Sequence, residues 1–104
     1  MQELQNLMNE IAHKYKFDST SYPSLKGKTP DEIFAFAVRH SALHMGKALG
    51  KVSTVSEAMD HGDEGSVELL EEGTVKMFIN VLRLAELQGM SAERLVALVP
   101  KMMK

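Results

Sequence analysis

The chain has 104 residues, a hydrophobic content of 44% and a formal net charge of −2. This length allows one domain, residues 1–104, with a core so modest that oligomerisation is expected. The hydrophobic content excludes a disordered chain, and the absence of cysteine excludes disulfides, thiolate metal sites and a cysteine nucleophile.

Neither a membrane nor a nucleic acid is expected as a partner. No apolar run approaches membrane-spanning length and the N-terminal segment has no apolar signal core, which predicts a cytoplasmic protein. No basic residue lies between Lys51 and Lys76, and the acidic residues there form a block that repels the phosphate backbone of a nucleic acid. That block is interpreted either as a solvated helix start or as part of a metal site. Its members are Glu57, Asp60, Asp63, Glu64, Glu68, Glu71 and Glu72.

Four main helical segments and no strand are predicted. The first covers about residues 2–15, because apolar residues recur there at three- and four-residue steps. They are Leu4, Leu7, Met8, Ile11 and Tyr15. Residues 17–28 contain proline, glycine and a serine–threonine cluster, which predicts a loop.

The second helix has a strong start signal. Thr29 can cap it, Pro30 suits its first position, and Glu32 completes a capping box. We expect this helix to run to about Leu49, with Gly50 as its stop. Apolar residues nearly encircle it, which is typical of a buried central helix. A chain of this size can barely cover such a helix, so a second copy is expected to complete the bundle.

The remaining elements follow from their own stop and start signals. A short helix is predicted over residues 53–61, and a long third helix over 66–88 with Gly89 as its stop. Ser91 is expected to cap the last helix, and Pro100 to end it or distort its last turn.

Two stretches carry a family resemblance. KTPDEIFAFAVRHSALHMGKALGK (28–51) and TVKMFINVLRLAELQGMSAERLVALV (74–99) resemble the paired core helices of the all-α nucleotide pyrophosphohydrolases, the MazG-like family. The resemblance covers about residues 2–101. It implies an all-α helical bundle completed by homo-oligomerisation, as a homodimer or homotetramer, with a nucleotide as ligand.

The family's metal-binding acids are absent from the matching positions. In that family, Glu-x-x-Glu on one helix and Glu-x-x-Asp on the next hold magnesium, which binds the triphosphate and activates a water. Matching HMGKAL and LRLA to the family places these positions on Ser41, His44, Gly73 and Lys76. The resemblance therefore implies a diverged protein that binds a nucleotide or related phosphate metabolite, with hydrolysis lost or weak.

Basic and amide side chains could bind such a ligand without a metal. The candidates are Lys47, Lys76, Asn80 and Arg83, since cationic groups bind phosphate directly. Lys76 could instead pair with Glu72, one helical turn before it, or extend into solvent.

A metal-dependent enzyme is the second alternative. His40 and His44 are spaced i, i+4 and lie on one helix face, and Glu68 or Glu72 could add an oxygen ligand from the facing helix. Histidines that are hydrogen-bonded within the fold, or exposed to solvent, explain the same i, i+4 spacing without a metal. Retained nucleoside triphosphate pyrophosphohydrolase activity would imply magnesium or manganese as cofactor. A non-enzymatic helical dimerisation or interaction module ranks ahead of this enzyme, as the first alternative.

Overall fold

The computed structural model describes residues 1–103 and contains four α-helices with no strand in that range. The helices are α1 (Gln2–Lys14), α2 (Pro30–Asp60), α3 (Val67–Leu87) and α4 (Ala92–Met102). A short 3₁₀-helix, η1 (Pro23–Leu25), lies in the loop between α1 and α2. The prediction of an all-α fold is confirmed.

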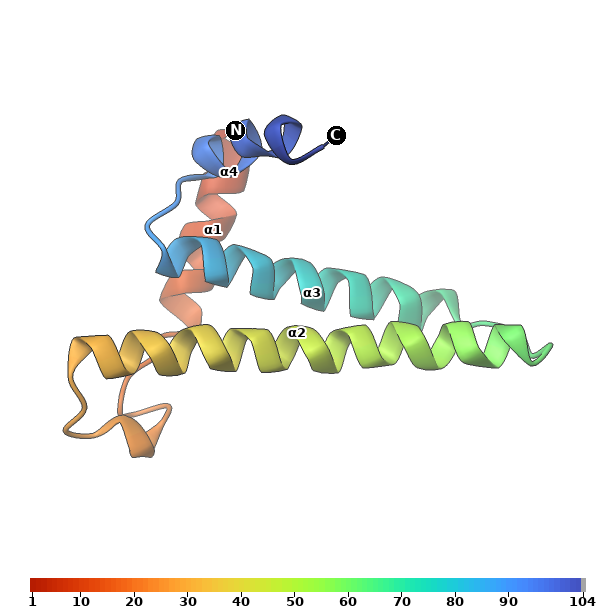
Figure 1. Ribbon diagram of the computed structural model, residues 1–104, viewed down its shortest axis with the longest axis horizontal. Helices are drawn as coiled ribbons and strands as arrows, with labels where there is room; N and C mark the ends of the chain where they lie inside the picture. The colour runs from red at the N-terminus through yellow and green to blue at the C-terminus, as the bar shows by residue number, and fades with distance from the viewer. Residues whose placement is uncertain (104) are drawn as a thin grey trace.

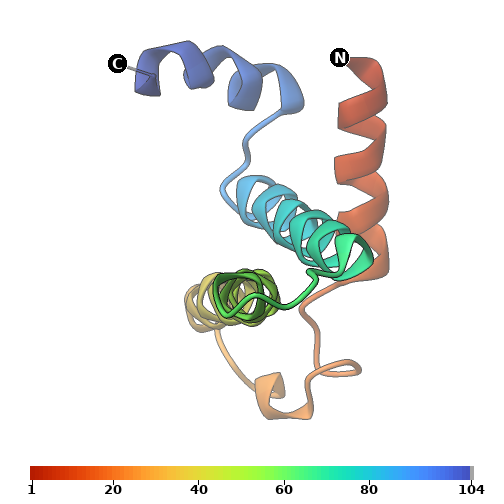
Figure 2. The same cartoon turned by 90° about the vertical axis from the view of Figure 1, so that its right-hand side faces the viewer.

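The two longest helices form an antiparallel hairpin (Figure 1). α1 crosses the C-terminal end of α3, and α4 packs against α1 (Figures 1 and 2). The loop between α1 and α2 passes to the side of α2 that faces away from α3. As a result, the end of α1, this loop, α2 and α3 all meet at one end of the hairpin.

Side-chain caps define where the helices begin. The Thr29 side chain accepts a hydrogen bond from the Glu32 amide, and the Glu32 carboxylate accepts one from the Thr29 amide, which is the predicted capping box. Ser66 and Ser91 cap α3 and α4 by accepting from the amide three residues further on. Gly89, with φ +74°, follows the end of α3 as predicted.

The prediction that the second helix ends at Gly50 is wrong. α2 continues without interruption to Asp60, so the short helix predicted over residues 53–61 is part of α2. Gly62, just beyond the end of α2, has the positive φ, +86°, that was expected of Gly50. A glycine weakens a helix by only about 1 kcal/mol, which tertiary packing can offset. Beyond Gly50 that packing comes from Val55, which is buried, and from Val52, which lies against Gly73 of α3.

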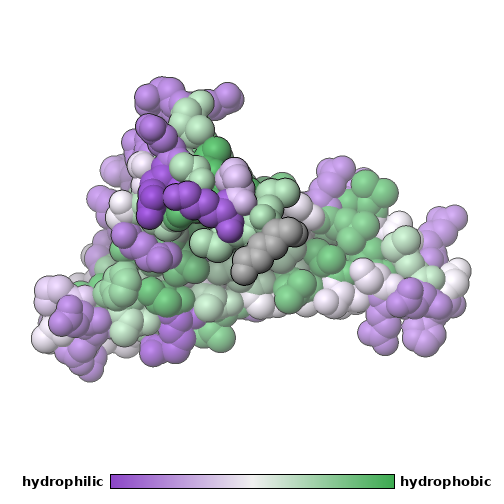
Figure 3. Space-filling view, turned by 45° about the horizontal axis from the view of Figure 1, so that its top comes forward, coloured by the Kyte–Doolittle hydropathy of each residue, from purple (hydrophilic) through white to green (hydrophobic). Residues whose placement is uncertain are grey.

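The main apolar core lies where α1, α3 and α4 meet. It consists of Met8, Ile11, Leu82, Ala85 and Ala92. The interpretation of α2 as a buried central helix does not hold within one chain, because α2 packs mainly against α3 alone. Phe34, Leu43 and Leu49 of α2 are each about half exposed. Figure 3 shows apolar side chains exposed along the body of the hairpin.

Candidate functional site

A pocket of about 430 Å³ opens at the junction of α2 and α3 with the end of α1 and the following loop. It is lined by Tyr15, Tyr22, His44, Lys47, Ala48, Lys51, Lys76, Ile79, Asn80 and Arg83. All four ligand-binding candidates from the sequence are therefore brought together. Two helices place them there, with one candidate on α2 and three on α3.

The pocket is strongly cationic. Lys47 and Lys51 reach it from successive turns of α2, and Lys76 and Arg83 reach it from α3. Within residues 1–103, the only carboxylate that pairs with any of these four cations is that of Glu72. Positive charge in excess of its counter-charge, gathered in a concave site, favours an anionic ligand.

Arg83 is a buried cation without a carboxylate partner among residues 1–103. Its residue exposure is 7%, and its Nε has no hydrogen-bond partner. One terminal nitrogen lies 3.4 Å from the carbonyl oxygen of Tyr15, and the guanidinium lies 4.5 Å from the ring centre of Phe17 and 5.3 Å from that of Tyr15. The aromatic rings stabilise the cation, but they do not neutralise it.

Asn80 adds a second incompletely satisfied polar group. Its amide nitrogen donates to the Lys76 carbonyl oxygen at 2.9 Å, whereas its buried Oδ1 has no partner. Asn80 is only 6% exposed and lines the pocket. A buried amide oxygen without a donor is costly, so a ligand hydroxyl or N–H that met it would be favoured.

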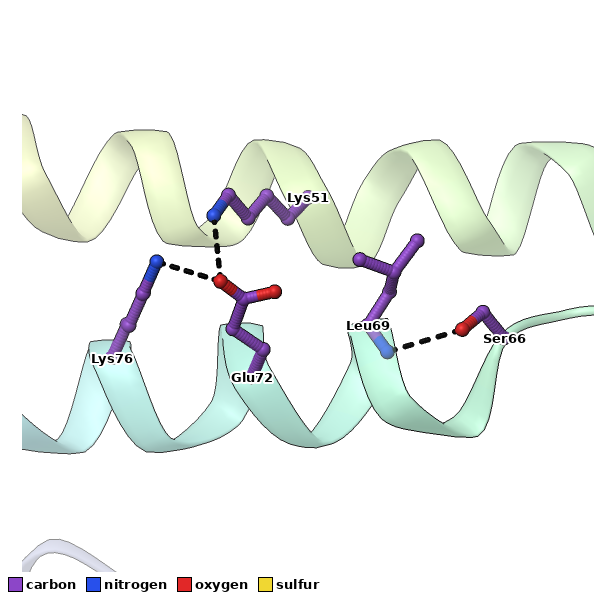
Figure 4. Close-up of polar contacts among 5 residues, drawn as sticks. All are labelled: Lys51, Ser66, Leu69, Glu72 and Lys76. Atoms are coloured by element: carbon purple, nitrogen blue, oxygen red, sulfur yellow. Dashed lines mark hydrogen bonds and ion pairs between the residues drawn. The ribbon is translucent and has the colours of Figure 1, made fainter.

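The predicted pair between Lys76 and Glu72 is confirmed. Lys76 Nζ lies 2.7 Å from Glu72 Oε1, and Lys51 Nζ from the facing helix lies 3.1 Å from the same oxygen (Figure 4). The hydrogen bonds from Lys76 and Lys51 lower the pKa of Glu72, and the bond to Glu72 raises the pKa of Lys76. Glu72 and Lys76 are therefore both charged near neutral pH.

A cluster of rings forms the wall beside the pocket. His40 stacks on Phe36 with ring centres 5.3 Å apart, and Tyr22 meets His40 edge-on at 4.9 Å. Phe17 stacks on Tyr22 within the loop at 5.4 Å, and the contacts of both rings with His40 hold the loop against α2. His40 Nε2 and His44 Nε2 are 3.0 Å apart, so one donates a hydrogen bond to the other. That geometry requires at least one neutral ring.

Acidification should destabilise the fold through this histidine pair. Burial is the main cause that lowers the pKa of each ring; the charge of the other histidine adds to this at His40, and Arg83 adds to it at both. The unfolded chain then binds more protons near and below pH 6.5, so the pair's contribution is complete above pH 6.5 and declines below it. We expect urea denaturation to show lower stability at pH 5.5 than at pH 7.5.

A double variant isolates this effect from other titrations. In His40→Phe/His44→Gln, the difference in the free energy of unfolding between the two pH values should shrink. An unchanged difference would assign the pH dependence to other groups.

The four metal-ligand candidates do not form one site within this chain. His40 and His44 are adjacent, but Glu72 is engaged by two lysines and Glu68 is exposed in the first turn of α3. Across residues 1–103, no three His, Asp or Glu side chains gather as metal ligands. Magnesium needs several oxygen ligands, and the ammonium groups beside Glu72 oppose a divalent cation. The residues present do not fit that ion.

Sequence reasoning missed Lys51, Tyr15 and Tyr22 as pocket residues. Lys51 was missed because the second helix was expected to end at Gly50. On the uninterrupted helix, Lys51 follows Lys47 by one turn and shares its face. The tyrosines lie at the end of α1 and in the loop, where no periodicity predicts which side chains face the hairpin.

No protein-family model, no curated protein and no solved structure matches this chain. Among the described helices, none combines the length and apolar character needed to cross a membrane.

Proposed function

We propose that the pocket between α2 and α3 binds a phosphate-bearing small molecule of the nucleotide class. The observation that carries this proposal is Arg83, a buried guanidinium with no carboxylate partner among residues 1–103. A buried charge without a counter-charge is costly, and breaking a buried pair typically costs about 3–5 kcal/mol. An anion in the pocket would supply the missing partner.

The neighbouring side chains suit phosphate better than a neutral ligand. Arginine presents a planar fork that can hold two phosphate oxygens, and lysines act as point charges beside it. Lys47 and Lys76 line the same pocket as Arg83, and Asn80 offers an unpartnered oxygen for a hydroxyl or N–H of the ligand. The tyrosine rings of the pocket supply flat apolar surface for a base or sugar.

The chain is, in this proposal, a diverged MazG-like protein in which hydrolysis is lost or slow. At the positions of the family's four acids, Ser41 is fully buried with an unpartnered hydroxyl, and Gly73 lies against α2. His44 and Lys76 line the cationic pocket. The charge of the groove would thus be inverted: cationic side chains would meet the phosphates where the family uses a metal.

Isothermal titration with pyrophosphate, ATP and adenosine tests the proposal. We expect pyrophosphate and ATP to bind at one site per chain with EDTA present, and adenosine to bind much more weakly. At a ligand concentration of a hundred times Kd, binding should add about 2.7 kcal/mol to the stability. Folded protein that binds neither phosphate compound contradicts the proposal. Binding that requires magnesium or manganese favours a metal-dependent pyrophosphohydrolase instead.

A second proposal, homodimerisation, rests on the shape and surface of the chain. Its radius of gyration is 16.3 Å, against about 13 Å for a compact chain of this length. Val75, Phe78 and Val81 recur every three residues along α3 with exposures of 56%, 47% and 38%. A stripe of this kind is typical of a face covered by another helix. Sedimentation equilibrium should give a dimer, and Phe78→Asp should shift it toward the monomer; a monomeric wild type contradicts this proposal.

A further inference from the structure

Glu72 pairs with two of the pocket's four cations. A single oxygen, Oε1, accepts hydrogen bonds from Lys76 Nζ at 2.7 Å and from Lys51 Nζ at 3.1 Å (Figure 4). Lys51 belongs to α2, whereas Glu72 and Lys76 belong to α3. The carboxylate thus lies between the helices, at the rim of the cationic pocket.

We propose that Glu72 is an internal competitor that lowers the affinity of this pocket for anions. Its carboxylate pairs with Lys51 and Lys76, and an incoming anion competes with it for the charge and the N–H groups of these lysines. This inference rests on the proposed function, because it assumes that the pocket binds phosphate. It adds a ligand class: polyanions such as di- and triphosphates, in preference to anions with a single charge.

The exposure of the three side chains makes displacement feasible. Glu72, Lys51 and Lys76 have side-chain exposures of 41%, 42% and 48%. Water screens ion pairs this exposed, so they are weak and open readily. The released carboxylate can be hydrated without leaving its helix.

Charge balance explains the preference for polyanions. A monoanion that displaces Glu72 replaces one negative charge with another, so the lysines gain little. A pyrophosphate group brings several charges and enough oxygens to reach both lysines and Arg83 together. A polyanion is therefore better able than a monoanion to compensate for the lost contacts of Glu72.

The neighbouring acids provide a matched control. Glu71 is adjacent in sequence and exposed, and it forms no ion pair with any of residues 1–103. Glu71→Gln removes the same charge from the same helix turn without freeing a lysine. Any effect of Glu72→Gln beyond that of Glu71→Gln reports the contacts of Glu72 rather than overall charge.

The experiment measures pyrophosphate and dimethyl phosphate affinities by calorimetric titration of wild type, Glu72→Gln and Glu71→Gln. We expect Glu72→Gln to bind pyrophosphate about three- to tenfold more tightly, because the ligand no longer competes with the weak ion pairs of Glu72. Its gain for dimethyl phosphate, a monoanion, should not exceed the gain for pyrophosphate, because removing one negative charge favours the ligand with more charges at least as much. Glu71→Gln should change either affinity by less than about twofold.

The outcomes separate this inference from the proposed function. Wild type that binds pyrophosphate while Glu72→Gln binds equally or less tightly overturns the inference, because Glu72 would then orient the lysines. No binding to either protein overturns the proposed function and the inference together. Binding to Glu72→Gln alone supports competition by Glu72 and contradicts phosphate binding by the wild-type pocket. If Glu72→Gln does not fold, Glu72→Asp, whose shorter side chain cannot keep both contacts, should show the same trend.

Discussion

Replacing Arg83 with methionine should lower the affinity for pyrophosphate by about ten- to a hundredfold. A hydrogen bond to a charged group contributes about 1.5–3 kcal/mol, and each 1.4 kcal/mol corresponds to a factor of ten. Arg83 is the most buried cation of the pocket, where solvent screens its charge least. Calorimetric titration of wild type and variant measures the ratio directly.

A second arginine in a similar ring contact provides the control. Arg39 lies 5.4 Å from the ring centre of Phe36, but it is exposed and does not line the pocket. Arg39→Met should therefore leave the pyrophosphate affinity within about twofold. Arg83→Lys should retain part of the affinity, because it keeps the charge and loses the planar fork. Folded Arg83→Met with wild-type affinity would remove the observation on which the proposed function rests.

Gly73→Ala should destabilise the fold by about 1–3 kcal/mol, the usual cost of overpacking. A Cβ at this position would lie 2.7 Å from Val52 Cγ2 and 3.1 Å from the Ala48 carbonyl oxygen. Both neighbours belong to α2, so the added side chain would force the two helices of the hairpin apart. Urea denaturation followed by circular dichroism measures the difference in the free energy of unfolding.

Gly46 is the matched control for that substitution. It also lies inside a helix, but no atom lies within 4 Å of where its Cβ would be. Gly46→Ala should raise the stability by about 0.5–1 kcal/mol, because alanine loses less backbone freedom on folding. Equal effects at the two positions would show that helix propensity, rather than close approach of α2 and α3, governs Gly73.

Local signals predicted the helix starts well and one helix end poorly. Thr29 and Ser91 cap their helices as predicted, and α3 begins beside Ser66 as expected, because a cap depends on hydrogen bonds within a few residues of the chain. Gly50 was expected to end a helix and does not. Whether a glycine ends a helix depends on what lies beyond it, and here Val52 and Val55 pack against other parts of the fold.

In the candidate site, too, the local sequence predicted some features and the packing of the helices decided the others. The sequence by itself determined the helix-forming pattern and the cationic candidates Lys47, Lys76 and Arg83. Only the tertiary structure decided that these cations share one pocket, that Lys51 joins them, and that Glu72 lies between Lys51 and Lys76. The physical reason is that periodicity along a helix places side chains on a face, whereas the pairing and register of two helices decide which faces meet.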